Sequence, residues 1–328
     1  MDQRDLGKTG LKVSALGYGC GAVGGLMVRA EPAEQTRAVA RALEAGITYF
    51  DTAPAYGDGA SEQNLGRALS ELGAWDRVVV GTKVRLGPGD LAEPTTAVRR
   101  SVEQSLRRLG RDSVDLLQLH NHIGLIRSEE GGLTLGLADA IGEVARAFEH
   151  VRDEGLTRHV GFTGLGETAA LLETAMAGAY ETVQAYFNVI NPSSGYPGFE
   201  HEEQDFGGLI DTAARAGLGV INIRVYAAGA LTGQLERHPI AGSPGGALAW
   251  GGEYEKDVER AHKLPSFVEE LGLESPFELA LRFALAKPGI STVLVGLSEL
   301  SHLENAIRWA ERGPLSDDVV RRLVEARI

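Results

Sequence analysis

The feature of this sequence that most constrains its fold is a regular alternation of two apolar patterns. Short runs rich in β-branched residues alternate with longer segments in which apolar residues recur every three or four positions. The first pattern indicates strands, and the second indicates amphipathic helices. We expect eight strands, at residues 14–19, 47–50, 77–83, 114–120, 158–164, 181–187, 218–224 and 291–296.

Most of these runs are largely apolar, which favours a parallel sheet buried on both faces. Eight strands alternating with helices are the content of a (β/α)8 TIM barrel, so we predict this α/β fold as one domain over residues 1–328. The alternative is a doubly wound open sheet, whose nucleotide motif is Gly-x-Gly-x-x-Gly. Gly19, Gly21 and Gly24 match that spacing, but the first helix start signal, Pro32, comes too late for the motif, and we favour the barrel.

The chain is longer than a simple barrel. A typical TIM barrel has about 250 residues, which leaves roughly 80 of this chain for additions. The segment "RDLGKTGLKVS", residues 4–14, has a Lys-Thr-Gly turn and predicts an N-terminal β-hairpin that closes the barrel bottom. Residues 229–275 form a long Gly-rich insertion between strands seven and eight. Insertions of this length are usually functional loops or disordered.

Composition disfavours several classes of partner. The formal net charge of −13 disfavours binding to the phosphates of nucleic acid. The single cysteine, Cys20, cannot form an internal disulfide, and the polar amino terminus does not resemble a signal peptide. No run reaches the roughly 18 apolar residues that span a membrane. We therefore expect a cytoplasmic protein that acts on a small molecule, and the sequence does not predict its oligomeric state.

Ionisable side chains stand at the ends of three successive predicted strands. Asp51 follows strand two, Lys83 ends strand three and His120 ends strand four, while Tyr56 lies in the loop "FDTAPAYGDGASEQNLG" after strand two. Because the carboxyl ends of barrel strands share the face that carries active sites, we expect the four side chains to converge. Taken singly, each has a structural interpretation, such as a turn capped by Asp51. In the same loop, Ser61 is the expected cap of the following helix.

The four residue types have complementary chemistry. A tyrosine has a pKa near 10. An ammonium about 4 Å away at an effective dielectric near 20 contributes roughly 4 kcal/mol, enough to lower that pKa by up to about 3 before desolvation opposes it. We therefore predict that Lys83 shifts the pKa of Tyr56 toward neutral, that Asp51 keeps Lys83 charged, and that His120 orients a carbonyl oxygen. A metal-dependent barrel hydrolase is the alternative, and "HNH" at 120–122 is its only candidate cluster.

At this point the chain resembles the aldo-keto reductases, from its start almost to its end. The resemblance is carried by "RDLGKTGLKVSALGYGCGAVGG", "FDTAPAYGDGASEQNLGRAL", "GTKV" and "DLLQLH". It implies that Asp51, Tyr56, Lys83 and His120 are the family's catalytic tetrad. It also implies hydride transfer to or from a nicotinamide cofactor, NAD(P)H, bound without a Rossmann domain.

The resemblance extends to residues that hold the nicotinamide. In the family a Ser-Asn pair after strand five and a Gln on strand six bind its carboxamide; here the Gln is Gln184, and the pair reads Thr163 and Gly164. A Thr-Gly pair resembles the branch of aldose and galactose dehydrogenases, which oxidise sugars. After strand seven, Ile223 stands near the position of a stacking tyrosine and Arg224 near that of a serine. Arg224 could reach the pyrophosphate or could pair with a local acid.

The ends of strands one and eight complete the implied cofactor site. The resemblance assigns cofactor contacts there to Gly19, Cys20, Gly296, Ser298, Glu299 and His302. Members that prefer NADP place a Lys or Arg after strand eight, whereas this chain has Glu299. A carboxylate repels the 2′-phosphate and can accept from ribose hydroxyls, so the chain leans toward NAD against the family preference for NADP.

The resulting prediction is a cytoplasmic NAD(P)-dependent oxidoreductase that interconverts a carbonyl and an alcohol, with Tyr56 as general acid and base. A sugar dehydrogenase that works mainly in the oxidative direction is one alternative. A cofactor-binding regulatory subunit with little turnover, like the β-subunits of potassium channels, is another. The substrate loops at 84–94, 121–138, 188–206 and after 229 are compatible with a sugar or an aromatic aldehyde.

Overall fold

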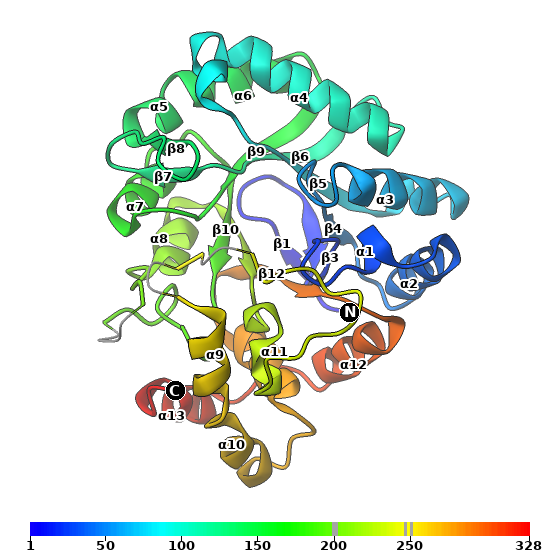
Figure 1. The fold of residues 1–328 in the computed structure, drawn as a ribbon, viewed down its shortest axis with the longest axis vertical. Helices are drawn as coiled ribbons and strands as arrows, with labels where there is room; N and C mark the ends of the chain where they lie inside the picture. Colours follow the sequence, from blue (N-terminus) through cyan, green and yellow to red (C-terminus); the bar gives the residue numbers. More distant parts are fainter. Residues whose placement is uncertain (199–202, 246–247, 250–251) are drawn as a thin grey trace.

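Eight parallel strands close into a barrel, with helices around it (Figure 1). The computed structural model describes residues 1–198, 203–245, 248–249 and 252–328. Neighbouring strands follow the order β10, β11, β12, β3, β4, β5, β6 and β9. Their bounds are β3 (Leu16–Gly19), β4 (Tyr49–Asp51), β5 (Val79–Val84), β6 (Val114–Leu119), β9 (Thr157–Thr163), β10 (Thr182–Tyr186), β11 (Gly219–Ile223) and β12 (Ile290–Gly296). The predicted barrel is confirmed, and each strand falls within or beside its predicted run.

Amphipathic helices cover the outside of the barrel. The larger ones are α2 (Pro32–Glu44), α3 (Ala60–Glu71), α4 (Pro94–Leu109), α6 (Glu143–Asp153), α7 (Thr168–Met176), α8 (Leu209–Ala216), α11 (Pro276–Ala286), α12 (Leu300–Glu311) and α13 (Asp317–Glu325). Helix α4 shows why the sequence folds this way. It begins with Pro94, ends at Gly110 in the left-handed conformation (φ 68°), and buries Val98, Val102 and Leu106 along one face.

The N-terminal hairpin closes the bottom of the barrel, as predicted. Strands β1 (Gln3–Asp5) and β2 (Lys12–Ser14) pair antiparallel. The apolar cluster at this end joins hairpin residues to inward-facing strand residues, namely Leu6, Leu11, Val13, Tyr49, Val79, Leu116, Ile221 and Leu294. Burial of this layer makes the barrel a packed core at this end, so any site must lie at the other end.

The first helix begins earlier than the sequence predicts. A short helix, α1 (Leu26–Arg29), precedes α2 and follows Gly25, whose φ of 94° is left-handed. Gly24 lets this segment approach the chain after β12, because a Cβ there would lie 2.4 Å from the carbonyl oxygen of Leu297. The prediction that Ser61 caps α3 is wrong. The cap position is Gly59, and the Ser61 hydroxyl donates to the carbonyl of Cys20 at 2.9 Å.

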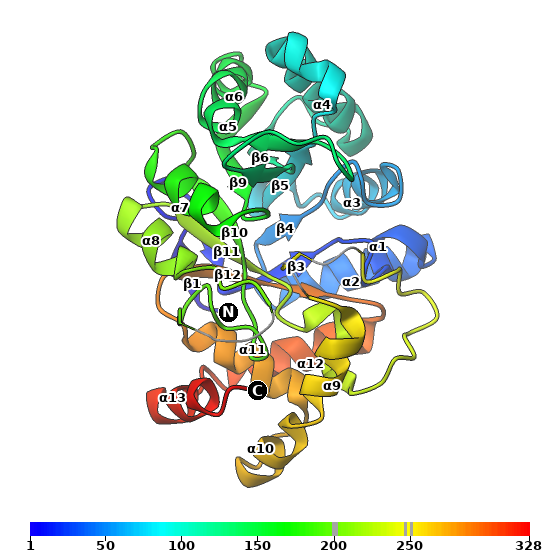
Figure 2. The ribbon, with the colours of Figure 1, turned by 60° about the vertical axis from the view of Figure 1, so that its left-hand side comes forward.

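The predicted insertion between the last two barrel strands contains ordered structure of its own. It includes most of the 3₁₀ helix η3 (Ala227–Thr232), helix α9 (Tyr254–Ala261) and helix α10 (Leu264–Glu270). Helix α9 packs against η3, and α10, at the bottom of Figure 2, packs against α11. The segment between η3 and α9 reaches across to α1. There Arg29 Nε donates to the carbonyl of Ile240 at 2.6 Å, and Gly242 N–H donates to that of Val23 at 3.0 Å. This segment therefore forms part of the barrel mouth.

The remaining elements are small additions to the barrel. They are β7 (His122–Gly124), β8 (Thr134–Gly136), α5 (Leu137–Ile141), η1 (Trp75–Arg77) and η2 (Pro88–Ala92). Within the described residues, no helix combines the length and the apolar character needed to cross a membrane.

Candidate active site

The predicted tetrad converges at the carboxyl ends of the barrel strands. A pocket of about 550 Å³ opens there, and Asp51, Tyr56 and His120 form part of its wall. Lys83 lies beneath this wall and has no exposed surface. The four side chains come from β4, the loop after it, β5 and the residue after β6. The barrel therefore brings together groups that are up to 69 positions apart in the chain (120 − 51 = 69).

Lys83 links the acid to the phenol. Its ammonium forms an ion pair with Asp51 Oδ1 and donates to the carbonyl of Thr52 at 2.9 Å and to the Tyr56 hydroxyl at 3.2 Å. These partners use all three ammonium donors. The ring of Tyr56 lies 6.1 Å from that of His120, centroid to centroid, at an angle of 89°. The phenol therefore stands between a fixed cation and an imidazole.

The second oxygen of Asp51 accepts three further hydrogen bonds that sequence reasoning missed. Its donors are Tyr49 OH at 3.2 Å, Gln118 Nε2 at 3.1 Å and Gln184 Nε2 at 2.6 Å. Strand alternation was the available signal, because Tyr49 precedes Asp51 by two positions, so both face the barrel interior. Gly81 makes room for this cluster, since a Cβ there would lie 2.7 Å from the Tyr49 oxygen.

The expected effect of Lys83 on Tyr56 is present, but a larger effect opposes it. Burial raises the pKa of Tyr56 above its ordinary value of 10.0, and the nearby Lys83 ammonium lowers it only in part. The prediction of a pKa shifted toward neutral is therefore wrong for this state. Burial also works against the ammonium of Lys83, but Asp51 and Tyr56 together raise its pKa above the ordinary value. Lys83 is thus charged at neutral pH.

His120 is neutral at physiological pH. Burial is the largest cause, and the charges of Lys83 and Arg85 add to it, lowering the pKa of His120 to about 3. A neutral imidazole has one N–H donor, which can hydrogen-bond an uncharged oxygen in the pocket. This agrees with the orienting role expected for His120.

The residues expected at the nicotinamide lie on the same pocket wall. Thr163 and Gln184 both line the pocket. The Thr163 hydroxyl donates to the carbonyl of Leu119 at 3.0 Å, and the Gln184 amide nitrogen is used by Asp51. Gly164 explains the departure from the Ser-Asn pair. A Cβ at this position would lie 2.8 Å from the carbonyl oxygen of Gln184, so this backbone has no room for an asparagine.

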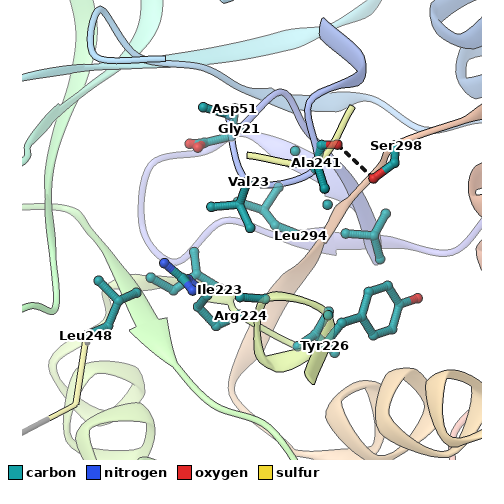
Figure 3. Close-up of a pocket in the computed structure, with 18 of the residues that line it drawn as sticks. Gly21, Val23, Asp51, Ile223, Arg224, Tyr226, Ala241, Leu248, Leu294 and Ser298 are labelled. Atoms are coloured by element: carbon teal, nitrogen blue, oxygen red, sulfur yellow. Dashed lines mark hydrogen bonds between the residues drawn. The ribbon is translucent and has the colours of Figure 1, made fainter. Parts of the chain in front are cut away.

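Ile223 and Arg224 lie next to each other on the pocket wall (Figure 3). Arg224 has a φ of 60°, which non-glycine residues rarely adopt. Its Nη2 donates to the carbonyl of Pro244 at 2.8 Å, and its own carbonyl accepts from Asn188 at 3.1 Å. No carboxylate in the described part of the chain lies within ion-pair distance of Arg224. Pairing with a local acid, one of the two expectations, is therefore not found there.

The ends of β3 and β12 form the opposite wall. Gly19, Gly296, Ser298 and His302 line the pocket, and the Ser298 hydroxyl donates to the carbonyl of Gly24 at 2.7 Å, the dashed line in Figure 3. The other two predicted contact residues lie outside this lining. Cys20 is buried. The carboxylate of Glu299 accepts a hydrogen bond from the Ser301 hydroxyl and lies 3.3 Å from His238 Nε2.

The long insertion, predicted to be one of the substrate loops, contributes several residues to the pocket lining. They are Glu236, Arg237, His238, Ala241, Leu248 and Tyr254, with Leu248 and Ala241 visible in Figure 3. Arg237 donates to the carbonyls of Ala228 at 2.6 Å, Gly242 at 3.0 Å and Val23 at 3.4 Å. These bonds hold the insertion over the barrel mouth. No local pattern predicts contacts between segments more than 200 positions apart.

This barrel with its tetrad agrees with the comparison to known proteins. The model of the Aldo/keto reductase family matches residues 15–328. The chain belongs to this family. Among its relatives, L-galactose dehydrogenase of Arabidopsis thaliana is 30% identical over 94% of this chain and 87% of the relative. A probable voltage-gated potassium channel subunit beta of Arabidopsis thaliana is 25% identical over 99% of this chain and 96% of the relative.

A solved family structure has the same fold. The aldo-keto reductase AKR11C1 from Bacillus halodurans, in its holo form, is 25% identical and superposes with a TM-score of 0.72 over 99% of this chain and 96% of that one. The chain is therefore a member of an oxidoreductase family and has that family's barrel fold. Within the described residues, no group of three or more His, Cys, Asp or Glu is arranged to hold a metal ion.

Proposed function

We propose that this family member is an NAD(P)-dependent oxidoreductase that interconverts a carbonyl and an alcohol, with Tyr56 as the general acid and base. One observation carries the proposal. The Tyr56 hydroxyl lies on the pocket wall, 3.2 Å from a buried lysine ammonium that a carboxylate holds in place. A buried ammonium at this distance can stabilise the negative charge of a phenolate, which a tyrosine with no role in proton transfer does not form.

Each tetrad residue has a defined task in this proposal. In reduction, Tyr56 gives its proton to the carbonyl oxygen; in oxidation, it takes the proton of the hydroxyl. Lys83 stabilises the phenolate that reduction leaves, and Asp51 keeps that ammonium charged and fixed. His120 donates a hydrogen bond to the substrate oxygen and orients it. A bound nicotinamide supplies or accepts the hydride.

The pocket residues fit such a cofactor. Backbone rather than side chains forms the wall at Gly21 and Gly296, where an added Cβ would meet no atom within 4 Å, so an extended ligand can approach closely. Gln184 would hold the carboxamide, Ile223 would pack on the ring, and Arg224 would bind the pyrophosphate. Both NAD and NADP are candidate cofactors in this proposal. Glu299, near the adenosine end, is our reason to favour NAD slightly, since its carboxylate would repel a 2′-phosphate.

A sugar substrate oxidised by this site is a second candidate. The pair Thr163–Gly164 and the similarity to L-galactose dehydrogenase favour it. The similarity to potassium channel subunits keeps a regulatory role as the rival.

One experiment separates these functions. NADH and NADPH are offered with a panel of aldehydes, and NAD and NADP with a panel of aldoses, while absorbance of the reduced nicotinamide is followed. The proposal expects turnover with either the aldehydes or the aldoses. We also propose a cytoplasmic location for the enzyme. Tight cofactor binding with no turnover across both halves would favour the regulatory subunit instead.

A further inference from the structure

Arg85 occupies a fixed place beside the candidate active site. It follows the last residue of β5 and stands two positions after Lys83. On one side, the backbone N–H of His120 donates to the carbonyl of Val84 at 2.8 Å. On the other, the side chain of Asn121 accepts from Leu86 N–H at 2.8 Å and donates to the Leu86 carbonyl at 2.9 Å. These bonds hold the backbone of Arg85 at the barrel end that carries the tetrad.

The charge of Arg85 is not neutralised within the described structure. Its side chain is exposed, and it forms no hydrogen bond or ion pair with any described residue. The neighbouring imidazoles of His120 and His122 carry no negative charge that could neutralise it, and burial together with the charge of Arg85 lowers the pKa of each. In a chain with a net charge of −13, an unpaired guanidinium at the barrel end that carries the tetrad is a candidate binding group for an anion.

The neighbouring loop leaves room around the guanidinium. Gly132 lies over it, and a Cβ at that position would be 3.5 Å from Arg85 Nη2. Gly131 and Gly132 have φ values of 69° and 118°, which other residues rarely adopt. The loop therefore passes beside the guanidinium without a side chain at this point and leaves it exposed. A guanidinium has five N–H donors in a planar fork, which matches a carboxylate or phosphate.

We propose that Arg85 binds a negatively charged group of the substrate, so that this enzyme acts on anionic carbonyl or alcohol compounds. The inference rests on the proposed function, since the carbonyl must sit at Tyr56 and His120 while the anion contacts Arg85. Carboxylate and phosphate share the required chemistry, and the experiment distinguishes them.

Matched substrate pairs test the proposal. Benzaldehyde is compared with 4-carboxybenzaldehyde, and glyceraldehyde with glyceraldehyde 3-phosphate, using the wild type, Arg85→Gln and Arg85→Lys. We expect the charged-to-uncharged ratio of kcat/KM to fall at least tenfold in Arg85→Gln, mainly through KM, with partial rescue in Arg85→Lys. The pair with the larger fall identifies the anion. Arg111→Gln, an exposed arginine over the Trp75 ring, is the control and should leave both ratios unchanged.

A binding measurement keeps this test independent of turnover. Benzoate and benzamide are titrated into the enzyme loaded with cofactor, and protein fluorescence reports binding. We expect benzoate, but not benzamide, to bind at least tenfold more weakly to Arg85→Gln than to the wild type. Equal benzoate affinity in the two proteins, or an unchanged substrate ratio, overturns the role of Arg85. Absence of turnover in the wild type with every substrate would instead refute the proposed function. The benzoate titration would still test whether Arg85 binds an anion.

Discussion

Tyr49→Phe tests whether the buried hydrogen bonds to Asp51 stabilise the site. The Tyr49 hydroxyl lies 3.2 Å from Asp51 Oδ2, and Tyr49 is fully buried while Asp51 is 4% exposed. A hydrogen bond to a charged group contributes about 1.5–3 kcal/mol. Because Gln118 and Gln184 still donate to the same oxygen, we expect a loss near the lower end, about 1.5 kcal/mol in the free energy of unfolding.

The neighbouring strand offers a matched control. Tyr18, on β3, is equally buried, and its hydroxyl has no hydrogen-bond partner among the described residues. Tyr18→Phe therefore removes the same atom without breaking a hydrogen bond, and we expect it to be neutral or slightly stabilising. Urea unfolding at pH 7 measures both variants. The reasoning is refuted if the two free energies of unfolding agree within about 0.5 kcal/mol, the error expected for independent sites.

Three further predictions follow from the site. His120 has a pKa of about 3 in the folded protein against 6.5 in the unfolded chain, so below pH 6.5 the unfolded chain binds more protons and the protein becomes less stable as the pH is lowered. When the pH is lowered from 7 to 5, the free energy of unfolding of the wild type, measured in urea, should fall by about 2 kcal/mol more than that of His120→Gln. Gly164→Ala should lower Tm by several degrees, because the added Cβ would meet the carbonyl oxygen of Gln184. Gly21→Ala, where an added Cβ meets no atom within 4 Å, should leave Tm unchanged, and equal Tm values for the two variants would contradict the steric argument. Arg224→Gln should weaken cofactor binding by at least about tenfold in a fluorescence titration, and unchanged affinity would remove Arg224 from the cofactor site.

Local patterns in the sequence were sufficient to predict the barrel. The eight strands are short, largely apolar runs, and Asp51, Lys83 and His120 stand at the ends of three of them, so topology alone brings the three together. The family resemblance then added a chemistry that these residues could not specify by themselves.

The missed features depend on distance and burial. Gln118 and Gln184 reach Asp51 only because the barrel closes, and the contacts of Arg237 join segments far apart in the chain. The pKa of Tyr56 was predicted in the wrong direction because the extent of its burial is a property of the folded protein. The departure at Gly164 was visible in the sequence, but its steric reason was not.

Tyr56→Phe tests the central claim most directly. Removal of one oxygen takes away the proposed proton donor and acceptor, while Lys83 keeps its bonds to Asp51 and Thr52. The measurement is kcat/KM with the best substrate of the panel, alongside thermal unfolding and cofactor titration, with Tyr18→Phe as control. We predict unchanged unfolding and cofactor affinity and a fall in turnover of at least about 100-fold. Turnover within a factor of two of the wild type would contradict the role of Tyr56.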